Sequence, residues 1–142
     1  MKLKWKALAM SALVAATCTV STLAVGDSNI EPRAGQGYIS GTIPNTSYSG
    51  NGVLKYVSTG KIQASTTSSK NTASVTAKVS SAKLKNPATG TTKTVSASTT
   101  YGTGSVAATA TAGSTYTQVV SASGYHTASF GGNSWSGGTY LP

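Results

Sequence analysis

Side chains able to do acid, base or metal chemistry are almost missing from this 142-residue sequence. Asp27 and Glu31 are its only acidic residues, His126 is its only histidine and Cys18 is its only cysteine. General acid–base catalysis and two-carboxylate glycoside hydrolysis both depend on positioned carboxylates or imidazoles. One imidazole and two distant acids also cannot close a zinc or calcium site. The sequence therefore predicts a non-enzymatic protein, with no catalytic residue, no metal and no cofactor.

Aromatic residues near the C-terminus are a stronger lead. Tyrosine and tryptophan combine a flat apolar face with a polar tip, which suits sugar rings and membrane interfaces. Trp135 stands in a glycine-flanked stretch, residues 131–138, that is expected to be a loop. Two interpretations are open, since Trp135 either contacts a ligand from this loop or folds back to cap the core. The candidate contact residues are Tyr125, His126, Trp135 and Tyr140.

His126 has two interpretations of its own. The first places it in a strand, with its ring at the sheet surface and no special role. In the second it adds positive charge below about pH 6.5 and strengthens the binding of anions.

Positive charge dominates the chain after residue 26, where eight basic residues face two acids. No carboxylate side chain occurs from Pro32 to Pro142, so no side-chain salt bridge can form within that range. Such a surface attracts polyanions, although the charge could also serve only to keep a Ser/Thr-rich protein soluble. The expected partner is an anionic cell-wall polymer or membrane surface, or a polysaccharide, and no specific nucleic acid. The candidate binding lysines are Lys55, Lys61, Lys70, Lys78, Lys83, Lys85 and Lys93.

The N-terminus has the layout of a secretory signal. Three lysines within the first six residues precede nineteen uncharged, largely apolar residues, as in the n- and h-regions of a signal peptide. We expect cleavage before Asp27, or alternatively after Ala24. A membrane anchor is a rival interpretation, but the many Ser, Thr and Ala residues make this stretch only modestly hydrophobic. Lipidation at Cys18 is a second rival, which the residues before the cysteine, Ala15 and Thr17, do not favour. The chain is therefore expected to be secreted, and either extracellular or attached to the cell surface.

Cleavage would remove the only cysteine, so the exported chain could form no disulfide. Small secreted eukaryotic domains commonly rely on disulfides, and this absence favours a bacterial source. In size, charge and lack of cysteine, the exported chain resembles small cationic bacteriocins in gross character only. No motif is shared, and no residue role follows from that resemblance.

The elements that would position these side chains are short strands. Apolar and polar residues alternate from Ala73 to Val79, the period of a half-buried strand. The pattern slips at Ser80–Ser81, which predicts a bulge. A Pro- and Gly-containing turn at 86–90 is then expected to lead into a partner strand at 91–99.

A second hairpin is predicted around Gly113–Ser114, which fits a two-residue loop joining 105–112 to 115–122. In that register residue 112 faces 115 and residue 106 faces 121. Further strands are expected at 37–43, 53–57 and 125–130, and the Ser/Thr-rich stretch 60–71 is expected to be exposed.

These elements predict an all-β protein, a small antiparallel β-sandwich or rolled sheet built from hairpins. The expected organisation is a signal peptide at 1–26, a flexible leader at 27–52 and a β domain at 53–142. The leading functional hypothesis is a secreted cationic protein that binds an anionic cell envelope, with a bacteriocin-like antimicrobial as one form of it. A structural or adhesive surface protein and a carbohydrate-binding module are the alternatives.

Overall fold

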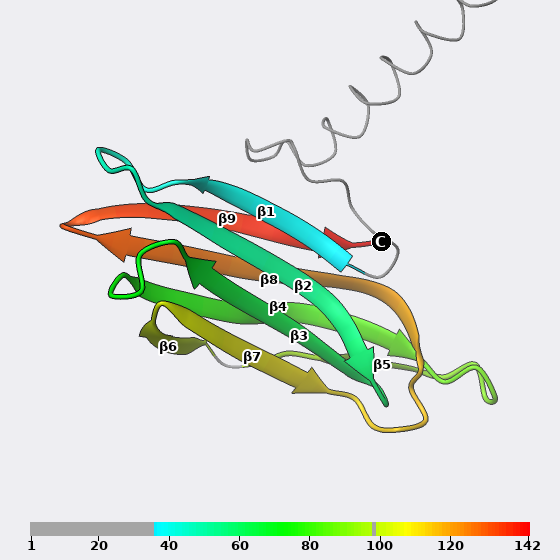
Figure 1. Cartoon of the computed structure of the whole chain (residues 1–142). Coiled ribbons are helices and arrows are strands. Elements are labelled where there is room, and N and C mark those ends of the chain that lie inside the picture. The colour runs from blue at the N-terminus through cyan, green and yellow to red at the C-terminus, as the bar shows by residue number, and fades with distance from the viewer. Residues whose placement is uncertain (1–35, 98) are drawn as a thin grey trace, which may run out of the picture.

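The computed structural model describes residues 36–97 and 99–142. The predicted signal peptide, Cys18 and the first part of the predicted leader lie outside these residues. Every regular element in the described part is a β-strand, and every strand pair is antiparallel (Figure 1). The prediction of an all-β protein with antiparallel pairing is thereby confirmed. The described residues include no helix long and apolar enough to cross a membrane.

The strands form two sheets that lie one over the other (Figure 1). Sheet A has the order β1-β2-β3-β7, with the bounds Gln36–Thr42, Ser49–Ser58, Lys61–Ser68 and Ser105–Thr111. Sheet B has the order β5-β4-β8-β9, with the bounds Thr92–Val95, Ser74–Lys85, Gln118–Phe130 and Asn133–Leu141. The short strand β6, Thr100–Thr103, pairs with β4 beyond β5 on the same edge of sheet B.

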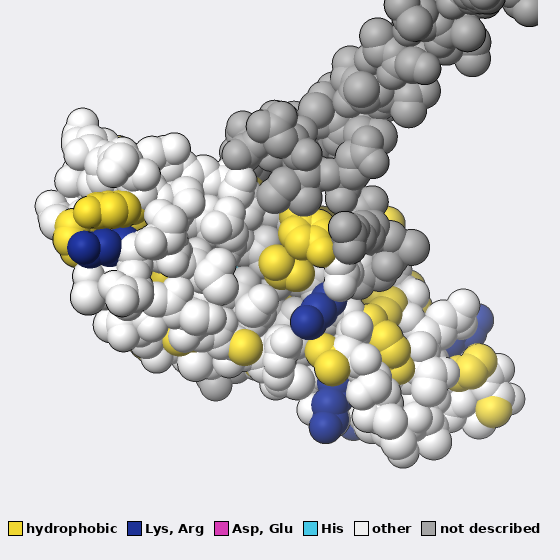
Figure 2. Space-filling model, viewed as in Figure 1, with side chains coloured by type: hydrophobic (Ala, Val, Ile, Leu, Met, Phe, Trp, Pro, Cys, Tyr) yellow, Lys and Arg dark blue, Asp and Glu magenta, His cyan; other side chains and the backbone are white. Residues whose placement is uncertain are grey.

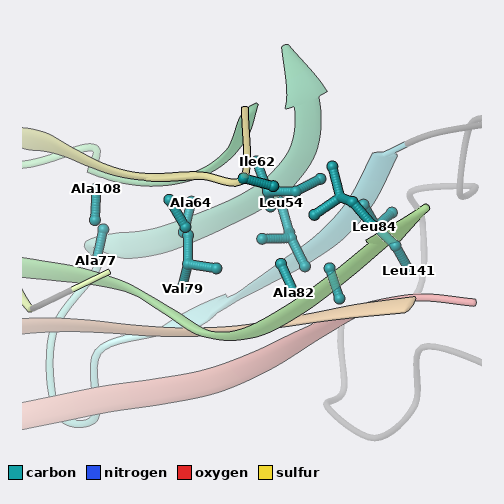
Figure 3. Packing of buried hydrophobic residues seen from close by; sticks show 12 residues of the cluster. Leu54, Ile62, Ala64, Ala77, Val79, Ala82, Leu84, Ala108 and Leu141 are labelled. Atoms are coloured by element: carbon teal, nitrogen blue, oxygen red, sulfur yellow. The ribbon is translucent and has the colours of Figure 1, made fainter. Parts of the chain in front are cut away.

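Two clusters of apolar side chains fill the space between the sheets. In the larger one, Leu54, Ile62, Val79 and Leu84 pack against many alanines (Figure 3). The second contains Ile39, Ile43, Ala73, Val75, Ala128 and Trp135. Because alternate residues of a strand point to opposite faces, each strand that contributes to a cluster also presents its other row of side chains toward solvent.

The bulge predicted from the sequence is confirmed, and so is the first hairpin, although its second strand ends at Val95 and does not extend through the predicted 91–99. The register of β4 against β8 shifts between Val79 and Ser81, and Ala82 and Leu84 point into the core beyond it. Strand β5 returns along β4, with Ala82 opposite Val95. The turn between them has Gly90 at a φ of 74°, a conformation that glycine adopts without steric cost.

The predicted second hairpin is wrong. Strand β7 pairs with β3, where Ala108 lies opposite Ala64, whereas β8 pairs with β4 and β9 in the other sheet. The segment around Gly113 therefore joins the two sheets instead of turning back within one. The alternation of residues 106–112 was assigned correctly, since Ala108, Ala110 and Ala112 are buried. Alternation tells which side of a strand is buried, but it does not tell which strand lies beside it.

The stretch 60–71, expected to be exposed, instead contributes strand β3 to the interior of sheet A. Ile62, Ala64 and Thr66 are fully buried in alternation with residues nearer solvent. Small and hydroxyl side chains on the inner face hid this pattern in the sequence. Strand β1 and the start of β2 lie within the stretch 27–52, and β1 coincides with the strand expected at 37–43.

Candidate functional site

The outer face of sheet B gathers three of the candidate lysines on one strand. On β4, Lys78 and Lys83 are exposed and Lys85 is half-buried, while Val79, Ala82 and Leu84 between them are buried. The strand pattern fixes this arrangement, because Val79 and Leu84 are fully buried on the opposite side. No carboxylate side chain occurs among the described residues to neutralise these lysines.

Exposed tyrosines lie on the same face as these lysines. Tyr101 on β6 is 75% exposed, Tyr125 on β8 is 46% exposed and Tyr140 on β9 is 62% exposed. Tyr125 lies directly opposite Lys78 on one side and Gly138 on the other. Three of the five exposed large apolar or aromatic residues of the described chain are therefore tyrosines on this face.

Hydroxyl side chains occupy most of the remaining outward positions on sheet B. The Thr76 and Thr127 hydroxyls hydrogen-bond to each other across β4 and β8. The Ser129 and Ser134 hydroxyls do the same across β8 and β9, at 2.6 Å. Ammonium groups, aromatic rings and hydroxyls on this face offer ion pairing, stacking and hydrogen bonding, the contacts that an anionic, hydroxyl-rich polymer requires.

The other four candidate lysines lie elsewhere. Lys55 and Lys61 point outward from sheet A. The face shown in Figure 2 carries such cations as separate dark blue groups on a mostly white surface, with no acid visible among the described residues. The seven lysines therefore do not form one surface.

Lys70 and Lys93 have contacts within the fold. The Lys70 Nζ lies 5.2 Å from the ring centre of Tyr48 and 5.3 Å from that of Phe130, and the two rings meet edge to face. The Lys93 Nζ donates a hydrogen bond to the Ala112 carbonyl oxygen at 2.9 Å and lies 5.8 Å from the ring centre of Tyr116. Cation–π and hydrogen-bond contacts of this kind tie neighbouring segments together, so we assign these two lysines a structural role.

His126 does not have its ring at the sheet surface, as one interpretation of the sequence expected; it is fully buried between the sheets. The Thr66 hydroxyl donates to the Thr76 carbonyl oxygen at 2.6 Å and so accepts from Nδ1 of His126, at 2.8 Å. The neutral ring then carries its proton on Nδ1, and Nε2 accepts from the Thr139 hydroxyl at 2.9 Å. Burial lowers the pKa of His126 from 6.5 to about 4. A hydrogen bond with the Ser65 backbone raises the pKa and so opposes part of this shift.

This depressed pKa also removes the expectation that His126 strengthens anion binding below about pH 6.5. In the folded protein the ring stays neutral down to about pH 4, and it is shielded from solvent.

Trp135 lies in strand β9, not in the expected glycine-rich loop, and is only 8% exposed. Of the two interpretations of Trp135, the structure therefore supports the core one. Glycines make the space for this ring. A Cβ atom on Gly41 would lie 2.2 Å from its Nε1, and one on Gly50 would lie 2.3 Å from its Cε3. Of the glycines that made residues 131–138 look like a loop, Gly131 and Gly132 form the turn before β9, whereas Gly137 and Gly138 are ordinary buried and exposed positions of the strand.

Tyr101 is an exposed tyrosine of this face that is not among the contact residues predicted from the sequence. Its segment has no clear alternation, and its position beside Thr76 follows only from the pairing of β6 with β4. Among the described residues, no group of three or more His, Cys, Asp or Glu side chains comes together to hold a metal. Comparison of the chain with protein-family models, curated proteins and solved structures finds no match.

Proposed function

We propose that this chain is a secreted, non-enzymatic cationic protein that binds an anionic polymer of the cell envelope through the outer face of sheet B. The observation that carries the proposal is the grouping of Lys78, Lys83 and Lys85 on one strand beside exposed tyrosines. With no acid among the described residues, this face keeps its full positive charge. Secretion rests on the signal-like N-terminus described above.

A binding role also fits the absence of catalytic groups at this face. The lone histidine is buried in the core, with both ring nitrogens already hydrogen-bonded to threonines. The exposed side chains of this face are lysine, tyrosine, serine and threonine. They can bind a ligand, but nucleophilic catalysis would also need a general base held beside them.

Two double variants with the same change in charge test the location of the site. K78Q/K83Q removes two cations from the outer face of sheet B, and K55Q/K61Q removes two from the outer face of sheet A. Binding to a purified anionic wall polymer, such as a teichoic acid, is measured across a salt series, with a neutral polysaccharide as the control ligand. We expect K78Q/K83Q to bind clearly more weakly than K55Q/K61Q. Equal weakening in both variants would show that net charge, and not this face, governs the attachment.

A further inference from the structure

The outer face of sheet B presents exposed tyrosines in a regular arrangement as well as positive charge. Resting on the function proposed above, we infer that this face binds a linear polysaccharide bearing acidic groups, laid diagonally across the strands. The sugar rings lie against Tyr101, Tyr125 and Tyr140, and an acidic group pairs with Lys78. These three tyrosines are called the tyrosine stripe below.

Strand register places the stripe on one diagonal of the sheet. Tyr101 on β6 is opposite Thr76 of β4, and Lys78 is the next outward residue along β4. Lys78 is opposite Tyr125 of β8. One outward position further in the same direction, Ser123 of β8 is opposite Tyr140 of β9. Crossing the strands from β6 to β9 therefore shifts the tyrosines steadily along the strand direction.

The length of this diagonal suits a polymer and not a single sugar. Three steps between strands span about 14 Å, and two outward positions along the strands add about 13 Å at right angles. The tyrosine stripe therefore extends about 20 Å, with Tyr125 and Tyr140 about 8 Å apart at the level of the backbone. A flexible single sugar could contact one ring only, whereas a chain of several sugars could contact all three tyrosines.

The surroundings of Tyr125 leave its ring accessible. One neighbouring position across the sheet is Gly138, which has no side chain and is exposed, and the other is Lys78. A sugar ring carrying a carboxylate or sulfate could therefore stack on Tyr125 and place its charge beside the Lys78 ammonium. Both residues stand on adjacent hydrogen-bonded strands away from the sheet edges, so their backbone positions are fixed before the ligand arrives and only the side chains have to be ordered on binding.

Several features favour a polysaccharide over a lipid membrane. Membrane association of this kind grows with the apolar area that enters the interface, and the residues between the tyrosines are mainly serine, threonine and lysine. The hydrogen-bonded hydroxyls of Thr76 and Thr127 stand beside Tyr101 and Tyr125, and Ser123 lies opposite Tyr140, so hydroxyl oxygen atoms accompany the stripe. Such a row can exchange hydrogen bonds with sugar hydroxyls but gains nothing from acyl chains.

Four probes separate these ligands for the purified protein: alginate, neutral dextran, polyphosphate and vesicles containing anionic phosphatidylglycerol. Alginate combines sugar rings with carboxylates, whereas polyphosphate carries charge without rings. Binding is measured at about 0.1 M and about 1 M salt, between which the Debye length falls from about 10 Å to about 3 Å. We expect alginate to bind most tightly and to retain part of its affinity at the higher salt concentration.

The decisive variant is Y101S/Y125S/Y140S, and Tyr38→Ser, which removes a half-buried tyrosine from the outer face of sheet A, is the control for a tyrosine outside the stripe. We expect the triple variant to lose about tenfold or more in affinity for alginate, with little change for polyphosphate. Tyr38→Ser should bind both probes as the parent protein does. Far-UV circular dichroism and thermal unfolding of each variant report whether the fold is kept, which the exposure of the three side chains leads us to expect.

The outcomes separate the two proposals. If polyphosphate and alginate bind equally, and the triple variant binds both normally, the polysaccharide inference is wrong while the proposed anionic-polymer site stands. If no polyanion binds, or if K78Q/K83Q and K55Q/K61Q behave alike, the proposed function itself fails. Tighter binding to the vesicles than to alginate would overturn the inference in favour of a membrane.

Discussion

Acidification from pH 7 to pH 4 should destabilise this fold through one residue, His126. The described residues contain no aspartate or glutamate and no other histidine. The ordinary cause of acid unfolding, the protonation of paired carboxylates, is therefore missing from this part of the chain. His126 is buried neutral between the sheets, and burial lowers its pKa to about 4.

The sign and size of the effect follow from proton linkage. In the unfolded chain the imidazole takes up a proton near its ordinary pKa of 6.5, whereas in the folded protein it stays neutral down to about pH 4. Because the unfolded state binds more protons in this window, the free energy of unfolding falls as the pH falls from about 6.5 to about 4. Over this pH range the free energy of unfolding falls by about 3 kcal/mol, since each unit of the pKa difference between the two states corresponds to about 1.4 kcal/mol.

Below pH 4 the native ring also protonates, and its hydrogen bonds must change. Nε2 becomes a donor that faces the Thr139 hydroxyl, which donates to Nε2 when the ring is neutral. The hydroxyl then has to turn toward another acceptor. We expect the pH dependence due to His126 to level off in this range, because both states then carry the proton.

Chemical denaturation at a series of pH values and constant ionic strength measures the effect. His126→Gln removes the titrating group but keeps a polar side chain for the two threonines, so its free energy of unfolding should vary little between pH 7 and pH 4. A D27N/E31Q variant, measured beside it, separates any contribution of these two acids from that of His126. An H126Q variant with the same loss of stability on acidification as the parent would refute the reasoning.

Two further predictions concern packing. Gly50→Ala should lower the free energy of unfolding by about 1–3 kcal/mol, the usual range for overpacking, because its Cβ would lie 2.3 Å from the Trp135 ring. Gly138→Ala is the matched control, having no atom closer than 3.7 Å to the added carbon, and a similar loss there would contradict the steric explanation; urea denaturation measures both. Lys70→Gln should cost about 0.5–1 kcal/mol by removing two cation–π contacts, whereas Lys61→Gln should be neutral in the same assay.

Local features of the fold were predictable from the sequence where a single strand or turn carried the signal. The alternation from Ala73 to Val79, the bulge at Ser80–Ser81 and the turn into β5 all match the structure. Each of these depends on residues close together in the chain. Strand β3 was missed because Thr66 is as fully buried as Ile62, although threonine is ordinarily a surface residue.

Non-local pairing was beyond such patterns. Gly113–Ser114 resembles a hairpin loop, but the inner faces of β7 and β8 find partners in different sheets. The sequence did contain one trace of the burial of Trp135, because the strands that face its ring carry glycines at positions 41 and 50 that leave room for it. That signal has meaning only once β1 and β2 are known to lie against β9.

Composition alone determined that any binding surface of residues 32–142 is cationic and has no carboxylate to neutralise it. Composition also determined the number of lysines and tyrosines, and the alternation of residues along the sequence determined the side of several strands on which they stand. Only the tertiary structure decided that Lys78 and Tyr125 are neighbours and that Tyr101 shares their face, while Trp135 and His126 are buried. The physical reason is that alternation is local to one strand, whereas the order of strands in a sheet depends on packing between distant segments.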